Sequence, residues 1–355
     1  MKTFIILAGL LFLAACQPQE PTKPATEVTR PTYELATTEA YDFSSIQPYA
    51  TDHGAVYDYI DTHLEQHVGA LQRWVRQPSI SAQNVGVQEM AEMLRQDLSD
   101  LGFKEAELVP TDGHPGVWGF YDAGAEKTLV VYLMYDVQPV NPEDWQSPPF
   151  DGEIIDHELG RVLMARGATN QKGPQRAFLN ALESIIAVEG TLPVNVMVAA
   201  EGEEELGSPH YPQIIDAYEE RLREADGVLF PFNSQNPDGK VSFLLGVKGI
   251  VYFEMVAQGG AWGGPTKAEI HGSYKAVTDA PVWRLVQALA SLTTPDGNTI
   301  LVPGYYDDVR PPTHEESMLI NASLENYDDE SIQSVLGVER WIDGKLGRDA
   351  MLEFL

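Results

Sequence analysis

The sequence predicts an α/β fold, a mixed sheet flanked by helices. Residues 128–134 and 194–200 are nearly continuous apolar runs, as expected of strands buried on both faces. Helical apolar periodicity precedes and follows these runs, and such alternation favours a parallel or mixed sheet. The chain has 355 residues, 43% of them hydrophobic, which is enough for about two domains and a sizeable core.

The first residues predict secretion. Residues 4–15 are an apolar run that is too short to span a bilayer and typical of a signal peptide. The run ends at the chain's only cysteine, in Leu13-Ala14-Ala15-Cys16, which resembles a lipoprotein lipobox. Residues 1–16 are therefore expected to be a lipoprotein signal peptide, with Cys16 as the lipidated residue. The alternative is an ordinary signal peptide with a chance cysteine.

The residue after the cysteine suggests a location. Gln17, in place of Asp, resembles the outer-membrane sorting class of bacterial lipoproteins. The expected location is the bacterial cell envelope, on the outer membrane facing the periplasm. Residues 17–50 are rich in proline and threonine, which predicts an extended linker.

Periodicity predicts the remaining elements in chain order. Helices are expected at residues 55–75, 87–101, 173–188 and 280–292. Strands are expected at residues 117–121, 128–134, 194–200, 228–230, 241–245 and 250–256.

The charge excludes two classes of partner. Lys and Arg number 23 against 53 Asp and Glu, which gives a formal net charge of −30. A nucleic-acid partner is not expected, because phosphate backbones are bound by Lys and Arg. Contact with the membrane is expected only through the lipid anchor, because anionic lipid attracts basic surfaces.

Three polar segments follow predicted strands: residues 134–139, 165–174 and 201–208. The carboxyl ends of parallel strands form the usual ligand-binding edge of an α/β sheet. In the third segment, four of the five residues 201–205 are glutamates, which repel one another. A solvated acidic turn is the simplest interpretation, and a carboxylate cluster that holds a cation is the alternative.

These segments, in this order, resemble the dinuclear zinc peptidase family that includes carnosinase-type dipeptidases, acetylornithine deacetylase and succinyl-diaminopimelate desuccinylase. The resemblance runs from about Tyr59 to the end of the chain. The matching segments are residues 78–81, Trp145 with 148–150, 166–168, 172–174, 201–208, 246–253 and 283–289.

The resemblance implies a domain plan. Residues 55–244 would be the N-terminal part of a catalytic domain. Residues 245–355 would be part of an inserted, smaller α/β lid that serves dimerisation, so a homodimer is expected of the full-length protein. The glycines of residues 246–249 are the expected hinge.

The resemblance also implies roles for individual residues. In the family, a water bridging two zinc ions is deprotonated by a glutamate. Glu204 matches that catalytic base and Glu205 a metal ligand. Asp136 matches a catalytic-site aspartate that orients a metal-binding histidine. Asn170 matches the metal position that bridges the ions. His271 matches a substrate-binding histidine of the lid, although a loop histidine without function is equally compatible.

The chain departs from the family at the metal ligands. Met134 replaces the first metal histidine, and a thioether is a poor ligand for Zn²⁺. Asn170 replaces the bridging aspartate, and Phe232 replaces a further aspartate, with Asn233 beside it. The last family ligand is a histidine that would lie beyond Leu355. Occupancy by one or two zinc ions is therefore in question.

Two functions remain open from the sequence. The first is a metallopeptidase-type hydrolase that cleaves amide bonds of small peptides or N-acyl amino acids. The second is a catalytically impaired, lipid-anchored relative that binds peptide or amino-acid ligands without a dinuclear metal centre. A structural protein that reuses the lid is a third possibility.

Overall fold

A computed structural model describes residues 28–46, 52–233, 235, 241–244, 246–251, 253–324 and 327–354. The predicted signal peptide and Cys16 lie outside these residues. The chain divides into two compact units, one of Tyr49–Gly249 and one of Met1–Pro48 with Ile250–Leu355. Each unit is described by itself.

The unit of Tyr49–Gly249 contains the predicted mixed sheet, which the structure confirms. The strand order is β1-β2-β6-β3-β7. β3 runs parallel to β6 and β7, whereas β2 pairs antiparallel with β1 and β6. The strands are β1 (Glu105–Val109), β2 (Gly116–Tyr121), β3 (Thr128–Met134), β6 (Asn195–Glu201) and β7 (Gly227–Leu229).

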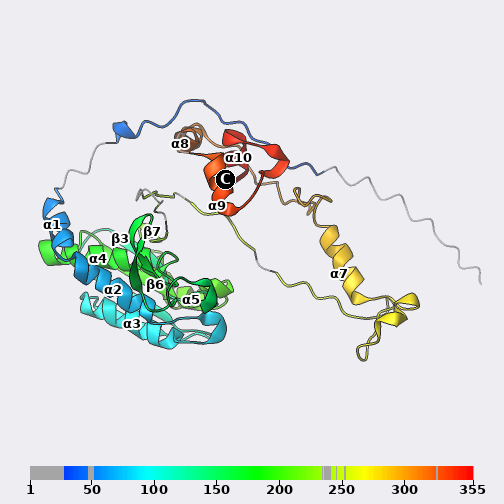
Figure 1. Ribbon diagram of the computed structural model, residues 1–355, viewed down its shortest axis with the longest axis horizontal. Helices are drawn as coiled ribbons and strands as arrows, with labels where there is room; N and C mark the ends of the chain where they lie inside the picture. The colour runs from blue at the N-terminus through cyan, green and yellow to red at the C-terminus, as the bar shows by residue number, and fades with distance from the viewer. Residues whose placement is uncertain are drawn as a thin grey trace, which may run out of the picture. The chain divides into compact units, whose positions relative to one another are not determined.

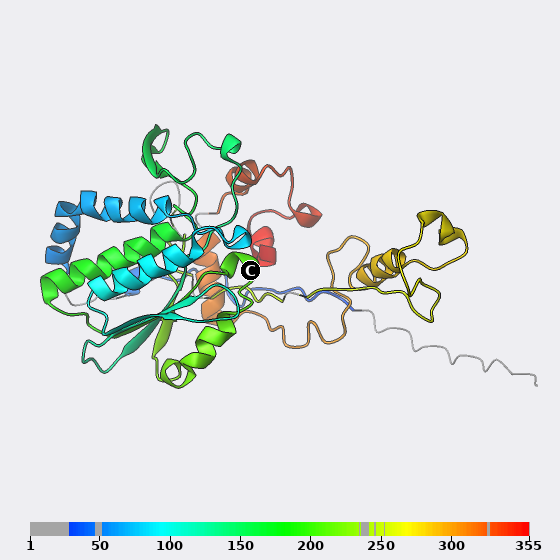
Figure 2. The same cartoon turned by 90° about the horizontal axis from the view of Figure 1, so that it is seen from below.

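Helices cover both faces of this sheet (Figure 1, Figure 2). One face packs against α2 (Leu64–Arg76), α3 (Val87–Asp100) and α4 (Lys172–Glu189), with Trp74 and Leu94 fully buried. The other face packs against α5 (Tyr211–Ala217) through Ile214 and against α6 (Glu219–Leu222) through Leu222. The apolar runs of β3 and β6 are thus buried on both sides, which is why they lack polar alternation.

The sequence analysis missed some local features. The helix expected at residues 55–75 is two helices, α1 (Gly54–Thr62) and α2, because His63 leaves helical geometry at φ −110° and ψ 14°. The His63 ring stacks on Tyr59 at that break, with centroids 3.8 Å apart. Strand β1 was not anticipated. Nor was the antiparallel hairpin of β4 (Glu153–His157) and β5 (Gly160–Met164).

Over its described residues, the second unit contains four α-helices joined by long irregular segments. Its helices are α7 (Pro281–Ala290), α8 (His314–Leu324), α9 (Asp329–Leu336) and α10 (Gly347–Phe354). Residues 28–46, from the predicted linker, contact α8. The Ala36 N–H donates to Ser317 Oγ at 2.9 Å, and Asn321 Nδ2 donates to the Thr37 carbonyl at 2.9 Å.

The two strands expected at residues 241–245 and 250–256 are not formed by the described residues of these segments. Val241 makes one isolated bridge with Gln235. Phe243 and Val251 are each 83% exposed. A strand needs a continuous partner for its backbone groups and a surface for its apolar face, and over their described length these segments have one isolated bridge and exposed apolar side chains.

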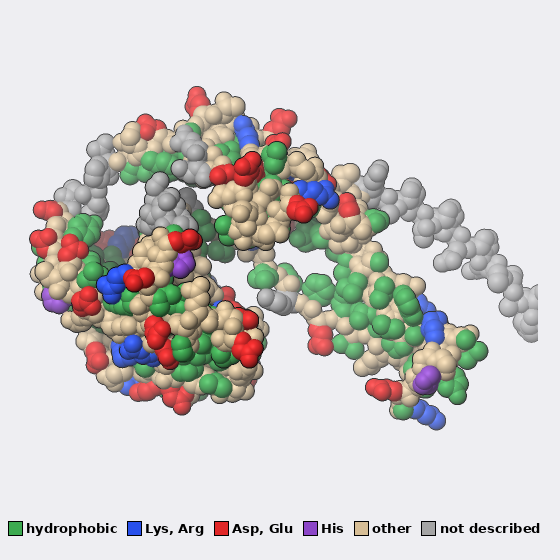
Figure 3. All heavy atoms as spheres, in the orientation of Figure 1, with side chains coloured by type: hydrophobic (Ala, Val, Ile, Leu, Met, Phe, Trp, Pro, Cys, Tyr) green, Lys and Arg blue, Asp and Glu red, His purple; other side chains and the backbone are tan. Residues whose placement is uncertain are grey.

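Acidic side chains are spread over the visible face of the molecule rather than gathered in one patch (Figure 3). Within the described part of the chain, no helix is long and apolar enough to cross a membrane.

Candidate functional site

The carboxyl ends of β3 and β6 bring residues 134–139 and 201–208 together, and residues 165–174 meet them through the contact of Asn170 with Glu205. β3 and β6 are parallel neighbours, and their register pairs Met134 with Glu201. Asp136 therefore lies beside the turn that carries Glu204 and Glu205, as the family resemblance requires.

Asp136 is fully buried and anchors that turn. Its two carboxylate oxygens accept the backbone N–H groups of Glu204 at 3.2 Å and Glu205 at 3.1 Å. Burial raises the pKa of Asp136 to about 6. Glu204 is half-buried, and burial together with the charges of Glu205 and Asp136 raises its pKa.

Glu205 is held by side-chain amides. Asn170 Nδ2 donates to one of its oxygens at 3.1 Å, and Gln138 Nε2 donates to the other at 2.9 Å. Gln171, next to Asn170, donates to the Asn170 side-chain oxygen and accepts the backbone N–H of Asn233 at 3.1 Å. Asn170 and Glu205 are thus in direct contact through a hydrogen bond from a neutral amide to a carboxylate oxygen.

Lys172 lies at the first residue of α4 and is fully buried. Its ammonium donates to the backbone carbonyls of Trp74 at 3.1 Å and Gln77 at 2.7 Å. Burial lowers its pKa to about 7, whereas the charge of Asp136 acts in the opposite direction.

Glu201 was not assigned a role by the sequence analysis. It is 2% exposed, and its Oε1 accepts the hydroxyls of Tyr132 at 2.7 Å and Ser208 at 2.8 Å. Its Oε2 is buried and has no hydrogen-bond partner among the described residues. Burial raises the pKa of Glu201 to about 7, against the hydrogen bonds from Tyr132 and Ser208.

The pair of Glu203 and His210 was also missed. His210 Nδ1 lies 2.7 Å from Glu203 Oε2, and Glu203 is buried. A Cβ at Gly113 would come within 2.3 Å of both side chains, so only glycine fits against this pair. The pair fixes the far end of the acidic turn.

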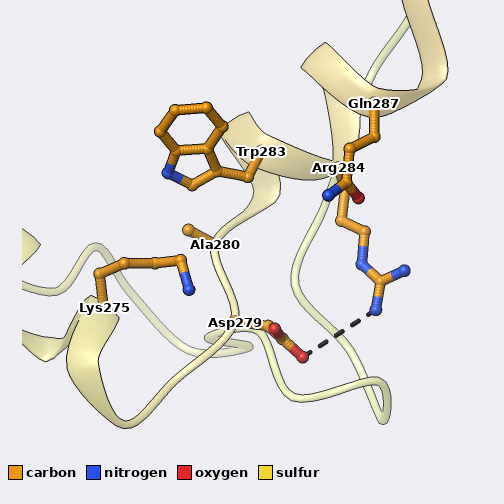
Figure 4. Close-up of a pocket in the computed structure, with 6 residues that line it drawn as sticks. All are labelled: Lys275, Asp279, Ala280, Trp283, Arg284 and Gln287. Carbon is orange, nitrogen blue, oxygen red and sulfur yellow. Dashed lines mark ion pairs between the residues drawn. The ribbon is translucent and has the colours of Figure 1, made fainter. Parts of the chain in front are cut away.

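His271 belongs to the other unit, where it precedes a short helical turn. The backbone N–H of Ser273 donates to its Nδ1 at 3.2 Å, and its ring is exposed. In the same unit, Arg284 Nη2 lies 4.0 Å from Asp279 in a hollow of about 310 Å³ (Figure 4). The hollow is lined by Lys275, Asp279, Ala280, Trp283, Arg284 and Gln287. His271 does not line it.

Comparison with known proteins identifies the family. The model of peptidase family M20/M25/M40 matches residues 132–310, about half of the chain, so this chain belongs to that family. A crystal structure of an M20 family metallo-carboxypeptidase from Sulfolobus solfataricus superposes with a TM-score of 0.66 at 31% identity. That match covers 81% of this chain and 62% of the other chain.

Curated relatives include dipeptidases. A Cys-Gly metallodipeptidase of Candida albicans is 29% identical over 81% of this chain and 60% of that protein. The human beta-Ala-His dipeptidase is 31% identical over 80% of this chain and 58% of that protein. The chain thus spans about 60% of the length of these relatives.

The metal centre implied by the family does not fit the residues at this edge. Asp136 and Glu205 already accept protein donors at both oxygens, and Asn170 offers a neutral amide. Met134 is buried and Phe232 is half-buried, and neither supplies a charged oxygen or an imidazole. Within the described ranges, no three His, Cys, Asp or Glu residues are grouped so as to hold a metal ion.

Proposed function

We propose that this chain binds small peptides or amino-acid derivatives at the carboxyl edge of its sheet, without a dinuclear metal centre. The observation that carries the proposal is the hydrogen bonding of the Asp136 and Glu205 carboxylates. Protein N–H groups occupy the oxygens of both carboxylates, where the family uses them around metal ions. The family scaffold supports a peptide-like ligand, and the neutral residues around it argue against water activation by metal.

A second candidate function is hydrolysis of amide bonds in small peptides or N-acyl amino acids. One observation favours it: burial and neighbouring carboxylates raise the pKa of Glu204, which suits a general base. In this proposal Glu204 takes a proton from the attacking water and passes it to the leaving amine. This candidate would need the zinc that the family resemblance implies, and because the residues at this edge do not fit a dinuclear centre, it would rest on at most one bound ion.

A binding and turnover experiment distinguishes the two functions. The relatives are named for Cys-Gly and beta-Ala-His dipeptides, which are therefore the first ligands to test. Titration calorimetry of the full chain in a chelator should show binding, and amine release should be undetectable with or without added zinc. Turnover that Glu204→Gln abolishes would establish the hydrolase instead, and absence of any binding would exclude the binding function.

The anchor and the oligomer are further proposals. Cys16 would hold the chain on the outer membrane of a bacterial cell envelope. A homodimer would form through α7, whose Val282, Trp283, Val286 and Leu289 are each 46–61% exposed. Light scattering should give a dimer mass for the native chain and a monomer mass for Val286→Asp. Arg284→Lys, an exposed change on the opposite side of α7 that keeps the charge, should leave the dimer intact.

A further inference from the structure

We propose that the carboxyl edge of the sheet recognises the free ammonium group of its ligand. Glu201 would supply the negative charge, and an aromatic cluster of Tyr132, Tyr211, Phe230 and Phe232 would supply ring faces. This inference rests on the proposed binding function, because it names the chemical group of the ligand that the site holds.

The first observation is the unpaired oxygen of Glu201. Its Oε1 takes two hydroxyl donors, which places the carboxyl group against Tyr132, while its Oε2 is buried without a partner among the described residues. A buried carboxylate is costly unless a cation or further donors compensate it. Lys172, the buried ammonium of the same edge, donates to two backbone carbonyls instead.

The second observation is the aromatic cluster, in which Tyr132 both donates to Glu201 and packs against other rings. The Tyr132 ring meets Tyr211 and Phe230 edge to face, with centroids 5.2 Å and 4.8 Å apart. Phe230 and Phe232 lie 5.7 Å apart. The four rings come from β3, from the start of α5 and from the residues after β7, and all are partly buried.

The cluster suits an organic cation better than a metal ion. Ring faces attract ammonium groups within about 6 Å of their centroids. They offer no lone pairs to a divalent ion, which prefers oxygen, nitrogen or sulfur ligands. Phe232 stands where the family has a metal-binding aspartate, so a metal ligand has been exchanged for a cation-binding ring.

The cluster also adjoins the rest of the site. Phe232 precedes Asn233, whose N–H donates to Gln171, and Asn170 contacts Glu205. A peptide with its ammonium at Glu201 and Phe232 would therefore have the segment of Asn170 and Glu205 beside the rest of its chain. An N-acylated peptide has no ammonium group to place there.

Titration calorimetry on the full chain tests this inference. The probes are Ala-Ala, N-acetyl-Ala-Ala and n-propylamine, the last of which carries the ammonium alone. We expect Ala-Ala to bind at least roughly tenfold more tightly than its N-acetyl form. We also expect n-propylamine to bind weakly and to compete with Ala-Ala.

Two variants locate the interaction. Glu201→Gln should weaken Ala-Ala binding roughly tenfold or more. Phe232→Leu should weaken it roughly two- to thirtyfold, and Phe232→Trp should preserve it. Glu126→Gln, an exposed change before the amino end of β3, is the matched control and should have no effect. If Glu201→Gln does not fold, the variants of Phe232, a half-buried residue, still test the ammonium site.

The outcomes separate this inference from the function on which it rests. Equal binding of Ala-Ala and its N-acetyl form would overturn the ammonium site and leave peptide binding intact. Binding of n-propylamine alone, sensitive to Phe232→Leu, would support the ammonium site and overturn peptide binding. Unchanged affinity in both Glu201→Gln and Phe232→Leu would overturn the ammonium site.

Discussion

At the scale of single residues, hydrogen-bond donors decide what the retained carboxylates can do. Asp136 and Glu205 stand at family positions, yet backbone and side-chain amides occupy their oxygens. Glu201 is the opposite case, because one of its oxygens is buried without a partner. The carboxyl group that lacks a hydrogen-bond partner is thus one to which the family resemblance gave no role.

Glu201 should make the stability of the fold depend on pH. Its folded-state pKa is about 7, above the usual 4.5, so between these values the folded state holds more protons than the unfolded state. Its contribution to stability is therefore complete below pH 4.5 and is lost as the pH rises through 7. The effect of Glu201→Gln on the free energy of unfolding should therefore be more favourable at pH 8 than at pH 4.5, by up to about 3 kcal/mol. Urea unfolding at the two pH values measures this, and an equal effect at both would contradict it.

At the scale of elements, one buried carboxylate ties three helices together. Asp97 on α3 accepts hydrogen bonds from Arg73 at 2.6 Å and Trp74 at 2.6 Å, both on α2, and from Arg176 on α4 at 2.9 Å. Asp97 and Arg176 are both nearly inaccessible to solvent. This network holds α4, and with it the segment of Asn170 and Lys172 at the site.

Removal of that carboxylate should destabilise the fold strongly. Asp97→Ala removes the closest carboxylate from the buried Arg176 guanidinium and leaves it Asn180 at 2.9 Å and Glu183 at 3.4 Å, which costs about 3–5 kcal/mol. Asp100→Asn, an exposed change on the same helix, should cost less than about 0.5 kcal/mol. Urea unfolding of both variants measures the difference. A loss below about 1 kcal/mol in Asp97→Ala would show that the network is not a main support of the helical layer.

The elements also show what sequence could and could not predict. The apolar run of β3 and the helical pattern of α4 could be predicted, because buried positions are occupied by apolar residues and their spacing is visible in the sequence. The acidic turn could be placed beside Asp136 from the family resemblance. The contact of Tyr132 with Glu201 and the stacking of Phe230 depend on the strand order β6-β3-β7, which no local pattern encodes. The strands expected near Phe243 failed because strand propensity alone supplies no partner.

At the scale of the whole molecule, the chain combines an M20-family fold with a predicted linker at residues 17–50. The chain covers about 60% of the length of the dipeptidase relatives, so activity and oligomeric state are proposals for the whole protein. Residues 28–46 follow the predicted leader and contact α8, which connects the region after the proposed anchor to the second unit.

Cys16 should decide whether the protein is attached to the membrane. Replacement by serine removes the thiol that would be acylated, so Cys16→Ser should move the protein from the membrane fraction to the soluble fraction. Cell fractionation with detection of the second unit measures this. Protein that stays with the membrane after Cys16→Ser would exclude the lipid anchor.

The most direct test of the central claim is the zinc content of the purified chain. We compare wild type with the triple variant Met134→His, Asn170→Asp, Phe232→Asp, which restores an imidazole and two carboxylates at the family's ligand positions. After dialysis against a zinc buffer, wild type should hold at most one zinc ion per chain, and the variant should hold more. Wild type that binds two zinc ions as tightly as the triple variant would contradict the account.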